Sequence, residues 1–254
     1  RVHHFLRFIL PPTATGIVYF LAATITFGLV GGSDGVAILW PASGILLAIL
    51  LSSGWGRAYR HVIAAAAASL AANVLAGNSL GISFGFTVAN ISESIAAAWF
   101  LRQQLIRRLS FSEPSDLVWF CLAATTGSAL SATIAVAATP ISSIDFWFSW
   151  FSTDLLGILI VTPLAMIGAN AIRSEGRIGQ ASVVLEGLLI FALVAIVSWL
   201  VFSQTGAPIL FLPMLSVLIS ASRLGPTGAA GGVLIVAGLS TFTLNVWSPA
   251  QNLF

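Results

Sequence analysis

The chain has 254 residues, of which 58% are hydrophobic and 7% are charged, and its formal net charge is +2. Soluble domains carry roughly 25% charged residues, so this composition excludes an ordinary soluble domain and predicts an all-α, polytopic transmembrane helical bundle. The positive excess is too small and scattered for a nucleic-acid-binding face, and the lone cysteine, Cys121, excludes an intrachain disulfide and a CxxC motif.

Nine apolar segments follow one another along the chain. Each is a candidate membrane helix, because about 20 apolar residues cross the hydrocarbon core. Pro41 interrupts the second segment and Pro213 the eighth, so both are expected to be broken or partial spans, and the expected count is about nine, with a range of eight to ten. The segments are 13–30, 36–53, 59–76, 81–101, 116–139, 146–171, 183–203, 208–222 and 227–246.

All ten basic residues are arginines, and all of them fall on one side if the nine segments alternate across the membrane. The connections on the other side, such as "GGSDG" at 31–35, contain none. This positive-inside pattern predicts a multi-pass membrane protein with a cytoplasmic N-terminus. Residues 1–254 are expected to form a single integral-membrane domain that ends outside, so one more helix would have to follow before any cytoplasmic domain.

Two carboxylates lie inside predicted helices. Glu93 lies roughly 17 Å and Asp154 roughly 12 Å from the outer end of its segment, at a rise of about 1.5 Å per residue. A charged side chain at the bilayer centre costs about 2.5 to 3.5 kcal/mol on insertion scales, and neither acid has an arginine at a similar depth. Both are expected to face the bundle interior, where they are functional candidates; a structural hydrogen bond between helices is the alternative.

Neighbouring side chains suggest that these acids belong to a binding site. Asn90 lies three residues before Glu93, and Trp150 lies four residues before Asp154, so each pair shares a helix face. An aromatic wall beside a carboxylate suits a small polar ligand or a cation.

The stretch "WPASG" at 40–44 is a second polar feature. Proline is favoured in the first turn of a helix, so a helix that begins at Pro41 would leave free backbone amides below the outer surface. Such a half-helix N-terminus favours anions and adds Trp40, Pro41 and Ser43 to the candidate ligand-binding residues. An ordinary kinked span with Trp40 at the membrane interface is the alternative.

Five short motifs occur in order along the chain: "WPASGILLAILL" (40–51), "AASLAANVLAG" (67–77), "TVANISESIAAAWFLR" (87–102), "WFSTDLLGILIVTPL" (150–164) and "RLGPTGAA" (223–230). Together they resemble the membrane-associated sensor domains of the first type, the MASE family, over most of the chain. The resemblance implies an N-terminal sensory input module in the bacterial inner membrane, followed in bacterial signalling proteins by a diguanylate cyclase, phosphodiesterase or histidine kinase domain. The matching motif positions are Pro41, Gly44, Asn73, Asn90, Glu93, Asp154, Gly157 and Pro163, which adds Asn73 to the ligand-binding candidates.

The leading hypothesis is therefore a sensory domain without catalytic residues. A ligand would bind near Asp154, Glu93, Asn90 and Trp150 and shift helices that are coupled to the output domain. The alternative is a small transporter, or a transporter-like subunit, whose intramembrane carboxylates bind a coupling proton. An intramembrane enzyme comes third, because no histidine lies well inside a segment to activate a serine.

The expected partners follow from the same hypothesis. They are membrane lipids, an unidentified small ligand and the output domain of the same chain, with no nucleic acid, cofactor or metal. The sequence leaves the oligomeric state open, and a homodimer is one arrangement that it allows.

Overall fold

The computed structural model describes residues 12–28, 39–105, 109–140, 143–173, 181–204, 209 and 211–247. These residues form eight helices and no strands, so the predicted all-α fold is confirmed. The chain divides into two compact units, residues 1–162 and 163–254, which are described separately below. The expected outer loop at 31–36 lies outside the described residues.

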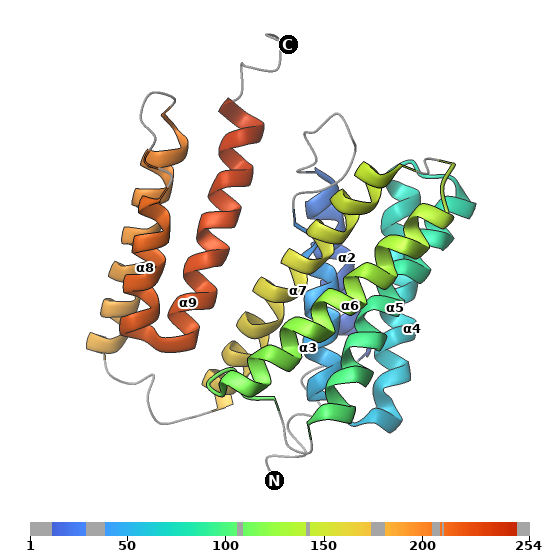
Figure 1. Ribbon diagram of the computed structural model, residues 1–254, viewed down its shortest axis with the longest axis horizontal. Coiled ribbons are helices and arrows are strands. Elements are labelled where there is room, and N and C mark those ends of the chain that lie inside the picture. The colour runs from blue at the N-terminus through green and yellow to red at the C-terminus, as the bar shows by residue number, and fades with distance from the viewer. Residues whose placement is uncertain are drawn as a thin grey trace. The chain divides into compact units, whose positions relative to one another are not determined.

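The first unit is a helical bundle (Figure 1). Helices α4 to α7 alternate in direction, so the α4–α5 and α6–α7 connections lie at the same end. Arg57 and Arg60 lie at the start of α4 and Arg102 in the last turn of α5, which places these arginines at the opposite end. The helices are α2 (Pro12–Gly28), α3 (Pro41–Ser52), α4 (Trp55–Leu75), α5 (Leu80–Gln104), α6 (Pro114–Ala137) and the first part of α7 (Ile144–Arg173).

Small residues let the helices of this unit approach closely, as they commonly do in membranes. A Cβ atom at Gly157 would collide with the carbonyl oxygen of Trp40, and one at Gly44 would collide with that of Gly157. Helices α3 and α7 therefore meet backbone to backbone. The largest fully buried side chains of the unit include two amides and one acid: Tyr19, Leu46, Leu47, Leu50, Asn73, Asn90, Glu93, Leu101, Phe120 and Ile158.

Helix α3 is a half-length helix that begins at Pro41, as predicted. Its 12 residues cover about 18 Å, well short of the roughly 30 Å hydrocarbon core. Hydrogen bonds tie the start of its backbone to α5 and α7, and its end to α5. The bonds are Trp40 N–H to the Thr153 carbonyl (3.2 Å), Ser94 Oγ to the Ser43 carbonyl (3.2 Å), Thr162 Oγ1 to the Gly44 carbonyl (3.0 Å), and Arg102 Nη2 to the carbonyls of Leu50 (2.6 Å) and Ser53 (2.7 Å).

Among the described helices, five are long and apolar enough to cross a membrane, namely α4 to α8. The expectation of about nine spans is therefore too high by this criterion. Helix α2 has 17 residues and α3 has 12, so both are shorter than the 18 residues taken as the minimum for a span. The segments predicted at 208–222 and 227–246 form the two arms of one interrupted element.

The second unit contains α8 (Ala181–Phe202) packed against α9 (Leu212–Trp247). Gly225, with φ of 63° and ψ of −147°, interrupts α9, and the two arms lie side by side (Figure 1). Ser220 Oγ in the first arm donates to the carbonyl of Gly228 in the second, at 2.8 Å. A Cβ at Gly232 would lie 3.6 Å from the Cβ of Ser220, so Gly228 and Gly232, a GxxxG pair, let the two arms pack closely.

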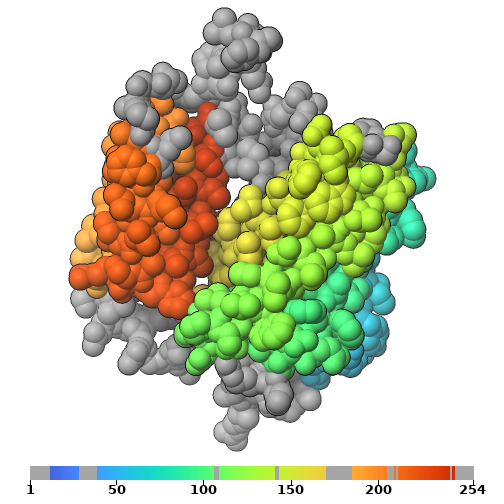
Figure 2. Space-filling view, viewed as in Figure 1, coloured from blue at the N-terminus to red at the C-terminus, as the bar shows by residue number. Residues whose placement is uncertain are grey.

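Large apolar side chains are exposed on the outside of both units. Ile63 is 64% exposed on α4, Leu188 is 63% exposed on α8 and Met214 is 71% exposed on α9. Figure 2 shows the side chains of α6 and α7 forming a continuous surface on one face of the first unit. With the five long apolar helices, this surface identifies the chain as a membrane-embedded helical domain.

Candidate functional site

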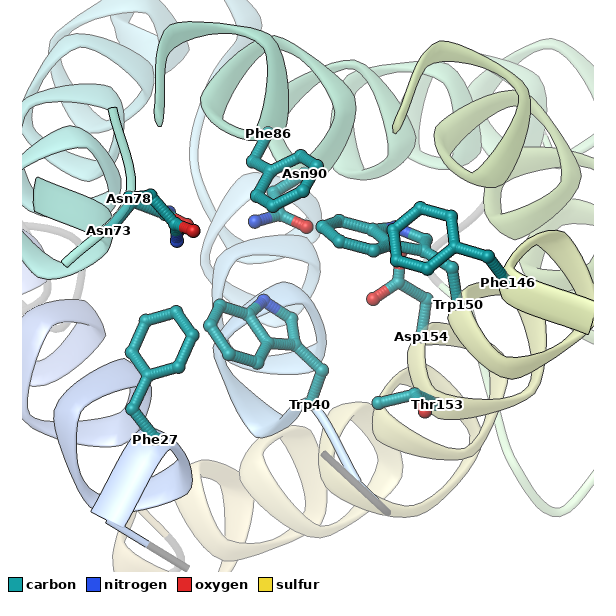
Figure 3. Close-up of a pocket in the computed structure, with 10 residues that line it drawn as sticks. All are labelled: Phe27, Trp40, Asn73, Asn78, Phe86, Asn90, Phe146, Trp150, Thr153 and Asp154. Carbon is teal, nitrogen blue, oxygen red and sulfur yellow. The ribbon is translucent and has the colours of Figure 1, made fainter. Parts of the chain in front are cut away.

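A cavity of about 90 Å³ lies in the first unit, at the end opposite Arg57 and Arg102 (Figure 3). We call it the aromatic pocket. The described residues that line it provide five aromatic rings, three amides, one hydroxyl and one carboxyl group. They belong to α2, α4, α5 and α7, except for Trp40, directly before α3, and Asn78, in the turn between α4 and α5. The lining residues are Phe27, Trp40, Asn73, Asn78, Phe86, Asn90, Phe146, Trp150, Thr153 and Asp154.

Helix α7 presents three pocket residues on one face, because Phe146, Trp150 and Asp154 are spaced four residues apart. Trp150 Nε1 donates to Ser131 Oγ on α6 at 2.9 Å, and Ser131 Oγ donates to Asp154 Oδ2 at 2.7 Å. An indole N–H is a donor only and a serine hydroxyl has one hydrogen. Ser131 therefore accepts from Trp150 and directs its hydrogen at the carboxyl group, which fixes the orientation of Asp154.

The rings form two walls (Figure 3). In one wall the ring centroids of Phe86 and Trp150 are 4.5 Å apart and those of Phe146 and Trp150 are 5.7 Å apart. In the other wall Phe27 and Trp40 meet edge to face at 5.2 Å. The Asn90 amide and the Asp154 carboxyl group lie between these walls. The pocket therefore combines π faces with a few converging polar groups, which is the usual composition of a small-molecule site.

The turn between α4 and α5 supplies the amides on the far side. Gly77 has a φ of 93°, which favours glycine. Its N–H donates to the Val74 carbonyl at 3.0 Å, and the Asn78 N–H donates to the Asn73 carbonyl at 3.2 Å. This is the hydrogen-bond pattern of a Schellman motif, and it holds the Asn78 side chain where Nδ2 donates to Asn73 Oδ1 at 3.3 Å.

Glu93 on α5 and Asp154 on α7 form a buried acid pair. They are 0% and 2% exposed and interact electrostatically with each other, so the prediction that both face the bundle interior is confirmed. Glu93 Oε1 accepts from Ser128 Oγ on α6 at 2.6 Å. Neither acid forms an ion pair with any described residue, so serine hydroxyls, rather than cations, are the main partners that the protein offers this pair.

The start of α3 lies beside this acid pair. Ser43 is a neighbour of Glu93, so a side-chain carboxyl group of the protein itself lies beside the N-terminus of this half-helix. A carboxyl group is stabilised at such a position by the free amides and the helix dipole.

Five buried polar atoms in this region have no hydrogen-bond partner within the described chain. More than nine-tenths of buried polar groups in proteins are paired, and each one left unpaired costs about 1 to 3 kcal/mol. The concentration of unpaired atoms marks a place where bound water or a ligand can supply the missing bonds. The atoms are Tyr19 OH, Trp40 Nε1, Ser43 Oγ, Asn90 Oδ1 and Glu93 Oε2.

The structure brings most of the sequence-predicted ligand-binding residues together. Glu93 adjoins the pocket through Asp154 without lining it, while Pro41 and Ser43 form the first turn of α3 and do not line it. The predicted residues that do line the pocket are Trp40, Asn73, Asn90, Trp150 and Asp154.

Five lining residues were missed by sequence reasoning: Phe27, Asn78, Phe86, Phe146 and Thr153. Helical spacing could have indicated two of them, because Phe86 precedes Asn90 by four residues and Phe146 precedes Trp150 by four. Asn78 follows Gly77, a typical helix-ending residue. Nothing in the sequence pattern singles out Phe27 or Thr153.

Comparison with protein families gives a match to MASE1 over residues 10–249. Comparison of the chain with curated proteins and with solved structures gives no significant match. The match includes both units and every residue of the aromatic pocket and the acid pair. The chain therefore belongs to MASE1, a family of membrane-associated sensory domains.

Proposed function

We propose that this domain senses a small ligand, which binds in the aromatic pocket and regulates a C-terminal cytoplasmic output domain of the same chain. The output domain would be a diguanylate cyclase, a phosphodiesterase or a histidine kinase in the bacterial inner membrane. The observation that carries the proposal is a pocket of about 90 Å³, lined by aromatic rings and by the buried Asn90 amide, whose Oδ1 lacks a partner among the described residues. A ligand there gains hydrogen bonds that the empty domain does not make.

Helix α3 offers a route from the pocket to the other face. Trp40, directly before α3, lines the pocket, and Arg102 holds the carbonyls of Leu50 and Ser53 at the opposite end. The Arg102 guanidinium also lies 4.9 Å from the ring centroid of Trp55. A ligand that binds one position of Trp40 better than another would shift the whole short helix and so change the surface at the arginine end.

The orientation of the domain can be tested with single cysteines in a Cys121→Ala background. Ala76 and Ser112 are both exposed and lie at opposite ends of the first unit. The arginine pattern predicts that the pocket end faces the periplasm. Ala76→Cys should therefore react with an impermeant thiol reagent in intact cells, and Ser112→Cys should react only after lysis. Labelling of Ser112→Cys alone in intact cells would reverse the proposed orientation.

The sensing role itself can be tested with two aromatic substitutions on α7. Trp150→Leu removes a pocket wall and the hydrogen bond to Ser131, whereas Phe148→Leu changes a ring that is 56% exposed and outside the pocket. In the chain with its natural C-terminal continuation, Trp150→Leu should fix the output at one level through all growth phases. Phe148→Leu should follow the parent. The measurement is the cellular cyclic dinucleotide level, or autophosphorylation for a kinase.

A transporter is the second candidate, favoured by the half-length α3 and the buried acid pair, both of which are features of transporter sites. Flux separates the two functions. A sensor binds its ligand without moving it across the membrane of a proteoliposome, whereas a transporter accumulates it.

A further inference from the structure

The lining of the aromatic pocket is selective for charge. Among the described lining residues the single ionisable group is the Asp154 carboxyl, and none of them is an arginine or a histidine, while the chain contains no lysine. Trp150, Phe86 and Phe146 surround the space beside this carboxyl with π faces. Aromatic faces attract cations within about 6 Å of the ring centroid, and a carboxylate supplies the counter-charge. An anionic ligand would find repulsion here and no cationic partner.

The unpaired polar atoms further limit the chemical class of ligand that the pocket can bind. Asn90 lines the pocket and is 1% exposed, and its Oδ1 has no hydrogen-bond donor among the described residues. Asp154 Oδ2 already accepts one hydrogen bond, from Ser131, and a carboxyl group can accept several. The ligand therefore has to bring N–H or O–H donors. A quaternary ammonium group could form cation–π contacts with the aromatic rings, but it has no N–H group to donate to Asn90.

The size of the cavity sets an upper limit on the ligand. Its volume is about 90 Å³, whereas an engineered apolar cavity of about 150 Å³ holds one benzene molecule and drug-sized ligands need about 300 Å³ or more. The pocket can therefore enclose only a group of a few heavy atoms. A larger molecule could place no more than its head group there.

We propose that the ligand of this domain is a primary organic ammonium, bound with its nitrogen between the Trp150 and Trp40 walls, its N–H groups donating to Asp154 and Asn90. The inference rests on the proposed function for the biological role of the site, but the binding chemistry follows from the pocket alone. The same ammonium chemistry has two sources. One is a free small amine that enters from the pocket end, and the other is the ethanolamine head group of a membrane lipid.

The test uses the purified domain in lipid-free detergent, with its tryptophan fluorescence as the signal. Ethanolamine and ethylammonium should give saturable changes, while propanol, a neutral molecule of similar size, should give none. Tetramethylammonium should bind about tenfold or more weakly than ethylammonium, since it cannot donate a hydrogen bond. Potassium chloride at matched concentration controls for ionic strength.

Two carboxylate variants locate the binding. Asp154→Asn should weaken ethylammonium binding by about tenfold or more, and Asp145→Asn, an exposed acid in the first turn of α7, should bind like the parent. The proposal would be overturned if propanol bound with the same affinity as ethylammonium. It would also be overturned if Asp154→Asn and the parent bound ethylammonium with equal affinity. The propanol comparison needs no variant, so it decides the question even where Asp154→Asn does not fold.

The source of the ammonium is decided in nanodiscs. Phosphatidylethanolamine that occupies the pocket should prevent the response to added ethylammonium, and discs of phosphatidylglycerol should restore it. Full responses in both lipids assign a free amine. If no ammonium compound binds but the output of the domain still depends on Trp150, the proposed ligand class is wrong. The proposed sensory function would then still be supported.

Discussion

Asp154→Asn is expected to reach the membrane in normal amounts and to abolish the signalling response. Asparagine keeps the shape of the side chain, and its Oδ1 can still accept the hydrogen that Ser131 now donates to Asp154 at 2.7 Å. The hydrogen-bonded series from Trp150 through Ser131 is thereby preserved. Only the ability to ionise is lost, and with it the one ionisable group among the described residues that line the pocket.

Asp154→Leu extends the same test. Leucine removes the insertion cost of an acid in the membrane, although it leaves the Ser131 hydroxyl without its acceptor. We expect this variant, like Asp154→Asn, to accumulate in the membrane and to give no signalling response. Membrane fractionation gives the amount of protein, and the product or phosphorylation state of the output domain gives the response. Asp145→Asn is the control, because this acid is exposed and lies outside the pocket.

The outcomes separate three roles for Asp154. Loss of response with normal accumulation identifies a sensing residue. Parent-like signalling in both variants would show that the charge has no part in sensing. Failure of both variants to accumulate would show that the acid pair with Glu93 is structural.

Gly157→Ala is expected to destabilise the domain by about 1 to 3 kcal/mol, which is the usual cost of overpacking. The added Cβ would collide with the carbonyl oxygen of Trp40, a main-chain atom that cannot move without shifting the start of α3. Thermal unfolding in detergent, followed by tryptophan fluorescence, measures the loss. The matched control is Gly168→Ala in the same helix, where a Cβ meets nothing within 4 Å.

Gly168→Ala should be neutral or stabilising by up to about 1 kcal/mol, because alanine favours the helix more than glycine does. The two variants therefore make the same chemical change with opposite expected signs. Equal melting temperatures for both would contradict the backbone contact between α3 and α7.

The membrane-embedded helical bundle could be predicted because one physical requirement dominates the composition. A chain with few charges must hide its backbone polar groups in helices when lipid surrounds it. The start of α3 could also be predicted, because Pro41 follows Trp40 and proline is favoured in the first turn of a helix. The number of spans could not be predicted, because helix length depends on tertiary packing, which hydropathy alone does not report.

The site was predicted only where depth and charge gave a signal. Glu93 and Asp154 were identifiable because a carboxylate inside an apolar segment is costly, and Asn90 and Trp150 followed by helical spacing. Phe27 could not be found in this way, since its place opposite Trp40 depends on how α2 packs against α3. Contacts of that kind are long-range, and no local pattern encodes them.

The way α3 is held has a consequence for related sequences. Arg102, Ser94 and Thr162 all donate to backbone carbonyls of α3 and of Ser53, the residue directly after it, not to side chains. Every amino acid supplies the same carbonyl, so a change of side chain at Leu50 or Ser43 does not require a matching change at Arg102 or Ser94. Methods that infer contacts from correlated substitutions detect pairs of side chains that change together. They should therefore find few coupled positions along α3, although its hydrogen bonds tie it to two neighbouring helices.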